Sequence, residues 1–154
     1  MKKVIALIIA LCFFSSMLNA ADNGLISIKS RFPVMHTTDR LIGLIEKKDL
    51  TMFKLIKHSE NAKSAGIKIQ PTELIIFGNP KVGSPLMKCA PTIAIDLPQK
   101  FLIWQDKNKQ TWITYNSPIY VADRHALPSE CRGSLHKIAM LLQTLSRIAG
   151  DSQP

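Results

Sequence analysis

Acid–base chemistry needs a histidine or a carboxylate beside a group that orients the substrate, and three residues of this chain are candidates for it. His58 follows an apolar run and could serve as a general base or a metal ligand. Asp96 lies between two apolar residues, a setting that suits a general acid. Asn79 stands in a Gly-Asn-Pro turn. Structural roles compete with catalysis at each position and carry more weight: a histidine at a strand–helix junction, a strand-end aspartate and a turn asparagine.

The segment from Gly78 to Gly83 has the glycine spacing of a phosphate-binding loop. Such a loop requires lysine and then serine or threonine directly after its second glycine. Here Ser84 and Pro85 follow, and Pro85 has no backbone N–H to donate. We therefore exclude a nucleotide site of this type and expect a shaped exit from a strand.

Metal and haem sites lack the usual sequence signals. The four histidines, at positions 36, 58, 125 and 136, have none of the short spacings of metal ligands, so we expect no metal site and no cofactor. A haem held by His58 and Met87 remains an alternative, although the covalent attachment motif is missing. The residues that could bind a small ligand instead are Asn79, Lys81, Met87, Trp104, Tyr115 and His125.

The first twenty residues read as a secretory signal peptide. Lys2 and Lys3 precede an apolar run from residue 4 to residue 14, and a small, polar stretch ends at Ala20. The alternative is an uncleaved anchor, but the run is short against the roughly 20 residues of a membrane span. We expect cleavage after Ala20, a single domain over residues 21–154, a periplasmic or secreted location, and no stable membrane span after cleavage.

The charge of the mature chain does not indicate a nucleic-acid partner. Removing the lysines at 2 and 3 from the formal charge of +9 leaves +7. The remaining lysines are dispersed along the chain and form no block. Export also argues against nucleic acid, so a solvated basic surface is the simpler interpretation.

Two cysteines, Cys89 and Cys131, remain after cleavage. An even pair in an oxidising compartment favours a disulfide between them, with two separate buried thiols as the alternative.

Hydrophobic periodicity predicts an α+β domain with a mainly antiparallel sheet. The expected strands are 25–31, 51–57, 74–77, 92–97, 100–105 and 111–115, with a hairpin turn at 106–109. The expected helices are one from Thr37 or Thr38 to Lys48, short ones at 59–65, 81–89 and 118–125, and a last one capped by Ser129 and ended by Gly150. This last helix would carry Cys131 on its inward stripe.

Strand 100–105 carries bulky apolar groups on both faces. Phe101 and Ile103 alternate with Leu102 and Trp104. Helices can cover one face, and a second copy of the chain is the simplest cover for the other, so we expect a homodimer.

A set of motifs across most of the mature chain resembles the family named domain of unknown function 302 (DUF 302). The resemblance is carried by residues 50–53, 56–58, 62, 65–66, 70–74, 77–81, 83, 85–87, 90–91, 96–98, 104, 115–116, 118, 120 and 124–127. It implies a curved antiparallel sheet with helices on one face, similar to the TATA-binding-protein-like class, and dimers. DNA binding does not follow from such a fold relation. The cysteines at 89 and 131 depart from the family pattern, so Cys89 is not a family nucleophile, and their joint presence in an exported member supports a disulfide.

The function expected from the sequence is therefore modest. We expect an exported, homodimeric module of the cell envelope that binds a small ligand or serves an accessory role, and that is not an enzyme. An enzyme with acid–base chemistry around His58 and Asp96 is the first alternative, and a haem or metal carrier is the second.

Overall fold

The computed structural model describes residues 23–151, so the expected signal peptide lies outside the described residues. The elements in chain order are β1 (Leu25–Ser30), α2 (Val34–Lys47), β2 (Thr51–Lys57), α3 (His58–Ser64), β3 (Thr72–Gly78), α4 (Pro80–Cys89), the 3-10 helix η1 (Pro91–Ile95), β4 (Gln99–Gln105), β5 (Thr111–Asn116), α5 (Pro118–Arg124), the 3-10 helix η2 (Ser129–Cys131) and α6 (Leu135–Gly150). No helix within this described part is both long and apolar enough to span a membrane.

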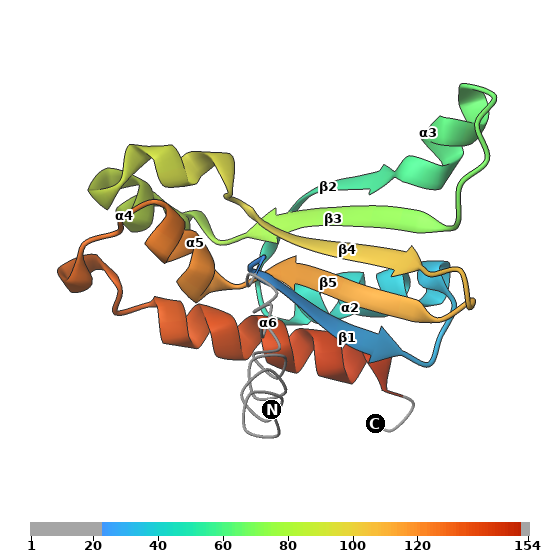
Figure 1. The fold of residues 1–154 in the computed structure, drawn as a ribbon. Coiled ribbons are helices and arrows are strands. Elements are labelled where there is room, and N and C mark those ends of the chain that lie inside the picture. Colours follow the sequence, from blue (N-terminus) through green and yellow to red (C-terminus); the bar gives the residue numbers. More distant parts are fainter. Residues whose placement is uncertain (1–22, 152–154) are drawn as a thin grey trace, which may run out of the picture.

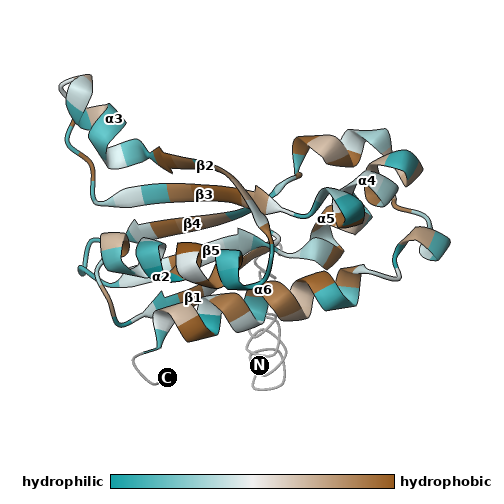
Figure 2. Ribbon diagram, turned by 180° about the vertical axis from the view of Figure 1, so that it is seen from behind, coloured by the Kyte–Doolittle hydropathy of each residue, from teal (hydrophilic) through white to brown (hydrophobic). Residues whose placement is uncertain are grey.

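The five strands form one open, curved sheet in the order β1-β5-β4-β3-β2, and every neighbouring pair is antiparallel. The long helices α2 and α6 lie on the same face of this sheet, as the two opposite views show (Figures 1 and 2). The predicted α+β class and the mainly antiparallel sheet with helices on one face are confirmed.

The main core lies between the sheet and these two helices. Ile75 and Phe77 of β3 alternate with half-buried residues, as a strand with one covered face requires. They pack with inward residues of β4 and β5 and with the apolar stripes of α2 and α6. The fully buried side chains of this cluster include Leu41, Ile45, Phe101, Ile103, Ile113 and Leu142.

A second hydrophobic cluster lies beyond the end of the sheet. It is built from α4, η1, α5, the segment around η2 and the first turns of α6, none of which is a strand. Its buried residues are Leu86, Ala90, Ile93, Val121, Ala122, Leu127 and Leu135. Figure 1 shows these short elements grouped at one end of the molecule, away from α3.

The prediction of a strand over residues 92–97 was wrong, because most of this segment forms η1. Backbone N–H groups of Ile93 and Asp96 donate to carbonyls three residues back, which is the 3-10 pattern. Ile93 is buried but Ile95 is 76 % exposed, so their spacing does not define one buried strand face. Pro91 at the first helical position fixes φ for a helical start.

Two helix starts also differ from prediction. Helix α2 begins at Val34, and Thr37 lies inside it, where its hydroxyl bonds to Ser30 Oγ at 2.7 Å. Helix α6 begins at Leu135, while Ser129 opens the separate η2 turn. Cys131 therefore belongs to η2 and not to the inward stripe of the last helix.

Candidate functional site

The three catalytic candidates do not converge on one site. His58 is the exposed first residue of α3, beyond one end of the β2–β3 ladder. Asn79 follows Gly78 at the other end of the same ladder. The six to seven residues of strand between these ends span about 20 Å. A site that uses His58 together with Asn79 is therefore excluded by the topology.

The same separation removes the haem alternative built on His58 and Met87. Met87 lies on α4, which begins directly after Asn79. Figure 1 shows α3 and α4 at opposite ends of the molecule. Two axial ligands must approach one iron atom from its two sides, and these two residues cannot.

Asn79 starts helix α4 and fixes its direction. Its Oδ1 accepts a hydrogen bond from the backbone N–H of Lys81 at 2.9 Å, which is N-cap geometry. Pro80 occupies the first helical position, where its missing N–H costs nothing. The Gly-Asn-Pro turn thus connects the end of the buried strand β3 to helix α4, which lies across a cavity from α6.

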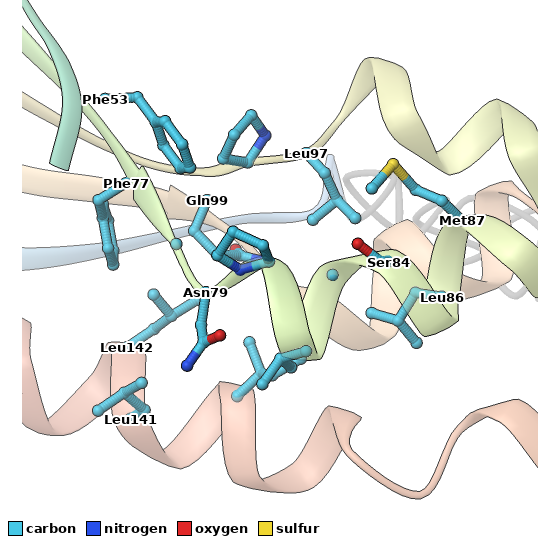
Figure 3. A pocket seen from close by; sticks show the side chains of 16 residues that line it. Phe53, Phe77, Asn79, Ser84, Leu86, Met87, Leu97, Gln99, Leu141 and Leu142 are labelled. Carbon is cyan, nitrogen blue, oxygen red and sulfur yellow. The ribbon is translucent and has the colours of Figure 1, made fainter. Parts of the chain in front are cut away.

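A largely apolar cavity of about 210 Å³ lies where α4 passes over α6 and the end of β3. Figure 3 shows side chains from these elements pointing into it, with Leu141 and Leu142 on α6 facing Asn79 and Leu86 on the α4 side. The lining residues are Phe53, Phe77, Gly78, Asn79, Pro80, Val82, Gly83, Ser84, Leu86, Met87, Leu97, Pro98, Gln99, Ile138, Leu141 and Leu142.

The polar groups of this cavity are few and uncharged. Asn79, Ser84 and Gln99 are the polar side chains among its lining residues. Asn79 Oδ1 is used by the helix cap, and its Nδ2 makes no hydrogen bond within residues 23–151. The Ser84 hydroxyl is likewise free of partners in this described part. A ligand with an apolar body and one neutral hydrogen-bonding group fits this lining.

Asp96 and His125 meet behind the cavity wall. His125 Nε2 lies 2.7 Å from Asp96 Oδ2, and His125 Nδ1 lies 3.1 Å from Thr92 Oγ1. The side chains of His125 and Asp96 are only 8 % and 11 % exposed, whereas Thr92 is exposed. Arg124 adds a longer ion pair to the same carboxylate oxygen at 3.5 Å. This chain of bonds joins the end of α5 to η1.

Lys100 holds the segment that follows Asp96. Its Nζ donates to the carbonyl oxygens of Asp96 at 2.7 Å and Pro98 at 3.0 Å. Partial burial lowers the pKa of Lys100, and the nearby Asp96 carboxylate opposes that change. Leu97, Pro98 and Gln99 line the cavity, so His125 and Lys100 position one of its walls without entering it.

Four of the predicted ligand-binding residues lie away from the cavity. Trp104 faces the open side of the sheet and donates from Nε1 to Thr114 Oγ1 at 2.9 Å. Tyr115 is buried in the main core against Phe101, and burial raises its pKa. Lys81 is exposed on α4, and His125 faces Asp96. Of the six candidates, Asn79 and Met87 line the cavity.

The sulfur atoms of Cys89 and Cys131 lie next to each other, although the two positions are 42 apart in the sequence. Cys89 is the last residue of α4, and Cys131 is the last residue of η2. Both side chains pack against the second hydrophobic cluster. The predicted partners are therefore adjacent in the fold, at the far end of the helix that covers the cavity.

Sequence reasoning missed most of the cavity wall. Phe53 and Leu97 come from β2 and from the segment before β4, and no local pattern links them to α4. Leu141 carried a signal, because it widens the apolar stripe of α6 beyond Leu135, Ile138, Leu142 and Leu145. Packing against one surface requires only a narrow apolar stripe. The extra width of this stripe therefore indicates a second contact.

The family model described as "Domain of unknown function DUF302" matches residues 26–145. The chain belongs to this family. A crystal structure of an uncharacterised conserved DUF302 protein from Bacillus stearothermophilus superposes with a TM-score of 0.73 and 14 % identity. The match covers 84 % of this chain and 99 % of that one, and it shows that the DUF302 fold is shared.

Curated relatives of this DUF302 chain come from Brucella. A protein of Brucella suis named fluoride-specific ion channel FluC 1 is 39 % identical over 114 residues, which cover 74 % of this chain and 45 % of that protein. Proteins of Brucella abortus (FluC 1) and Brucella melitensis (FluC 2) match at the same identity with 42 % of their lengths covered. The DUF302 chain thus spans less than half the length of these relatives.

Proposed function

We propose that this DUF302 protein is an exported, non-enzymatic module that binds a small, mainly apolar molecule between α4, α6 and the end of β3. The cavity of about 210 Å³ carries this proposal. An apolar cavity of about 150 Å³ in another protein is large enough for benzene, so a ligand somewhat larger than one ring is the matching size. Its neutral polar group would bond to Asn79 Nδ2 or to the Ser84 hydroxyl.

Gly83 offers a direct test, because it lines the cavity from α4. A Cβ added there meets Leu97 Cδ1 at 3.9 Å, an ordinary contact, so a leucine side chain can extend into the cavity. Gly43 on α2 is the matched control, because a Cβ there meets nothing within 4 Å. Both changes replace a helical glycine by leucine, and one of them fills the cavity.

The measurement is fluorescence titration with 2-naphthol, a neutral probe of two fused rings and one hydroxyl group. We expect the wild type and Gly43→Leu to bind the probe alike, and Gly83→Leu to bind it at least tenfold more weakly. Circular dichroism must show that both variants are folded. Equal binding by Gly83→Leu would reject the cavity as the binding site.

We further propose that the protein is periplasmic or secreted and that Cys89 and Cys131 are bonded there. The basic start, apolar run and Ala20 site support export, and the adjacency of the two sulfurs supports the bond. Mass spectrometry of the exported protein should give an N-terminus at Ala21. A thiol assay on that protein after denaturation should find none, and two titratable thiols would contradict the proposal.

We also propose a homodimer that pairs the open sheet faces. Leu74, Leu102, Trp104 and Trp112 share this face by register, opposite the helix-covered side. No helix of residues 23–151 covers it. Light scattering should give a dimeric mass for the wild type and a monomeric mass for Leu102→Glu. Exposed Ile119 on α5 supplies the control Ile119→Glu, which should stay dimeric.

An accessory role beside a membrane protein agrees with the Brucella relatives. Their printed name describes a fluoride channel, and the part that matches this chain is under half of each protein. We propose that the domain assists such a partner and is not itself the channel.

Acid–base chemistry is a second candidate function, and one observation favours it. The hydrogen bonds from Thr92 through His125 to Asp96 place a hydroxyl, a base and a carboxylate in one row. In this arrangement His125 would be the base, the role that the sequence suggested for His58. A fluorophosphonate probe should then label Thr92, and Thr92→Val or His125→Gln should abolish labelling. If the wild type stays unlabelled, the nucleophile interpretation fails and the cavity proposal stands.

A further inference from the structure

The connection between β2 and β3 forms an arm that projects from the sheet. It consists of α3 and the segment that follows, residues 58–71. Both views show α3 standing away from the rest of the molecule (Figures 1 and 2). Helix α3 has no buried residue, and every residue from 63 to 71 is exposed. The arm therefore adds little to the core, and its residues are available to a partner.

The tip of the arm has a defined geometry. Gly66 takes φ +77° after the last turn of α3, and its N–H donates to Lys63 O. The N–H of Ile67 donates to Ala62 O at 2.9 Å. These two bonds form a Schellman motif, in which the residue after the glycine usually packs back onto the helix. Here Ile67 is 59 % exposed, so the motif holds an apolar side chain in solvent.

A second apolar side chain and two free cations accompany Ile67. Ile69 is 44 % exposed, and Lys68 lies between the two isoleucines. Lys63 and Lys68 make no ion pair within residues 23–151. The acidic residue of the arm, Glu60, is already paired with Lys57 at 3.1 Å. The tip therefore combines exposed branched apolar groups with unneutralised positive charge.

We propose that this tip, Ile67 and Ile69 with Lys63 and Lys68, docks on the surface of an anionic lipid bilayer. Apolar side chains enter the boundary between headgroups and acyl chains, while lysines remain at the headgroups and attract anionic lipid. A protein groove would accept the isoleucines, but it would need acidic partners placed for each lysine. A bilayer supplies negative charge at every position and needs no shaped complement. The arm lies at the opposite end of the molecule from α4, so docking leaves the cavity open.

The expected affinity change follows from the number of groups. Each lysine near an anionic surface changes binding about fivefold, so replacing both Lys63 and Lys68 lowers partitioning about 25-fold. Added salt shortens the Debye length and so weakens the contribution of the lysines to binding, whereas the contribution of the isoleucines does not depend on screening. Replacing Ile67 and Ile69 by serine should lower partitioning at least tenfold at any salt concentration.

Vesicle co-sedimentation tests this proposal. The exported form is purified, its N-terminus is determined, and all variants are compared in that same form. The vesicles contain phosphatidylcholine with one-quarter phosphatidylglycerol, or phosphatidylcholine alone. Matched controls are Ile119→Ser, which removes an isoleucine that is 47 % exposed on α5, and Lys107→Gln in the β4–β5 turn. We expect anionic vesicles to retain the wild type and both controls, and to release the Ile67→Ser/Ile69→Ser and Lys63→Gln/Lys68→Gln variants.

Three results would overturn the proposal. The wild type could fail to sediment with anionic vesicles, or the arm variants could sediment as the controls do. The arm variants could also change the molecular mass seen by light scattering without changing vesicle binding, which would make the tip a protein contact. Probe binding in the cavity is measured separately, so this test does not depend on the proposed ligand site.

Discussion

Reducing the proposed disulfide between Cys89 and Cys131 should destabilise the protein by about 4 kcal/mol. That bond would close a loop between positions 42 apart in the sequence, and the chain-entropy relation converts this length into roughly that free energy at 25 °C. A domain of this size has a total stability of about 5–15 kcal/mol, so the loss is a large share of it. With an unfolding entropy of roughly 2 cal/mol/K per residue over the described residues, the midpoint temperature should fall by about 15 °C.

Reduction is a cleaner perturbation than substitution here. Both sulfur atoms pack against the second hydrophobic cluster, so replacing them also removes packing. A reductant opens the loop and leaves both side chains in place. The assay is urea unfolding of the purified protein, followed by tryptophan fluorescence, with and without reductant. Linear extrapolation then gives the free energy of unfolding in each condition.

The variant Cys89→Ala/Cys131→Ala is the control. Its free energy of unfolding should not change with reductant. That free energy should also be lower than the value for the reduced wild type, because the packing of the two sulfur atoms is lost. The reasoning is refuted if the reductant leaves the wild-type midpoint unchanged while thiols become titratable in the native protein. That result would mean that short-range packing already restricts this loop in the unfolded chain.

Three further predictions concern stability. Arg40 donates three hydrogen bonds to carbonyl oxygens at the end of α6, so Arg40→Lys, which keeps the charge but loses the fork, should cost about 2 kcal/mol in urea unfolding. Gly150→Ala would place a Cβ 2.6 Å from a carbonyl oxygen at the end of β1 and should cost about 1–3 kcal/mol in thermal unfolding, whereas Gly43→Ala should gain about 0.5–1 kcal/mol. The hydrogen bond from Trp112, followed by backbone N–H groups, lowers the pKa of Asp106 below its ordinary value of 3.8. Its stabilisation is therefore present at neutral pH and lost as the pH falls through the lowered value, so the deficit of Asp106→Asn in urea unfolding should vanish in strong acid.

The sheet could be predicted because its signals are local. The alternation in β1 and the apolar run of β3 identify strands, and residues 106–109 mark the β4–β5 hairpin. The strand prediction for residues 92–97 failed for a physical reason. Its isoleucines alternate as in a strand, but Pro91 begins a helical turn whose bonds are all local. A five-residue run does not distinguish these two states.

The candidate site was less accessible, because its contacts join distant segments. Asn79 and Met87 could be found together, since one helix and its cap carry both. Asp96 and His125 are 29 positions apart in the sequence, and no local pattern at either position predicts a bond to the other. His58 lies within the family motif and beside a strand end, yet the antiparallel pairing of β2 with β3 places it far from Asn79. Sequence spacing gives residue types, and pairing direction decides which end of the sheet they share.

The cavity lies at the boundary between two hydrophobic clusters, which explains why it stays open. Phe77 and Leu142 belong to the main core, Leu86 belongs to the second cluster, and Ile138 contacts both. The second cluster contains no strand, so backbone pairing with the sheet cannot pull it closer. Its short elements are instead held from the outside, by the His125–Asp96 bond and by the Cys89–Cys131 contact. Because these links fix α4 and η1 at their far ends, they set the spacing between the two clusters. Opening the Cys89–Cys131 link should therefore weaken probe binding in the cavity even under conditions where the protein remains folded.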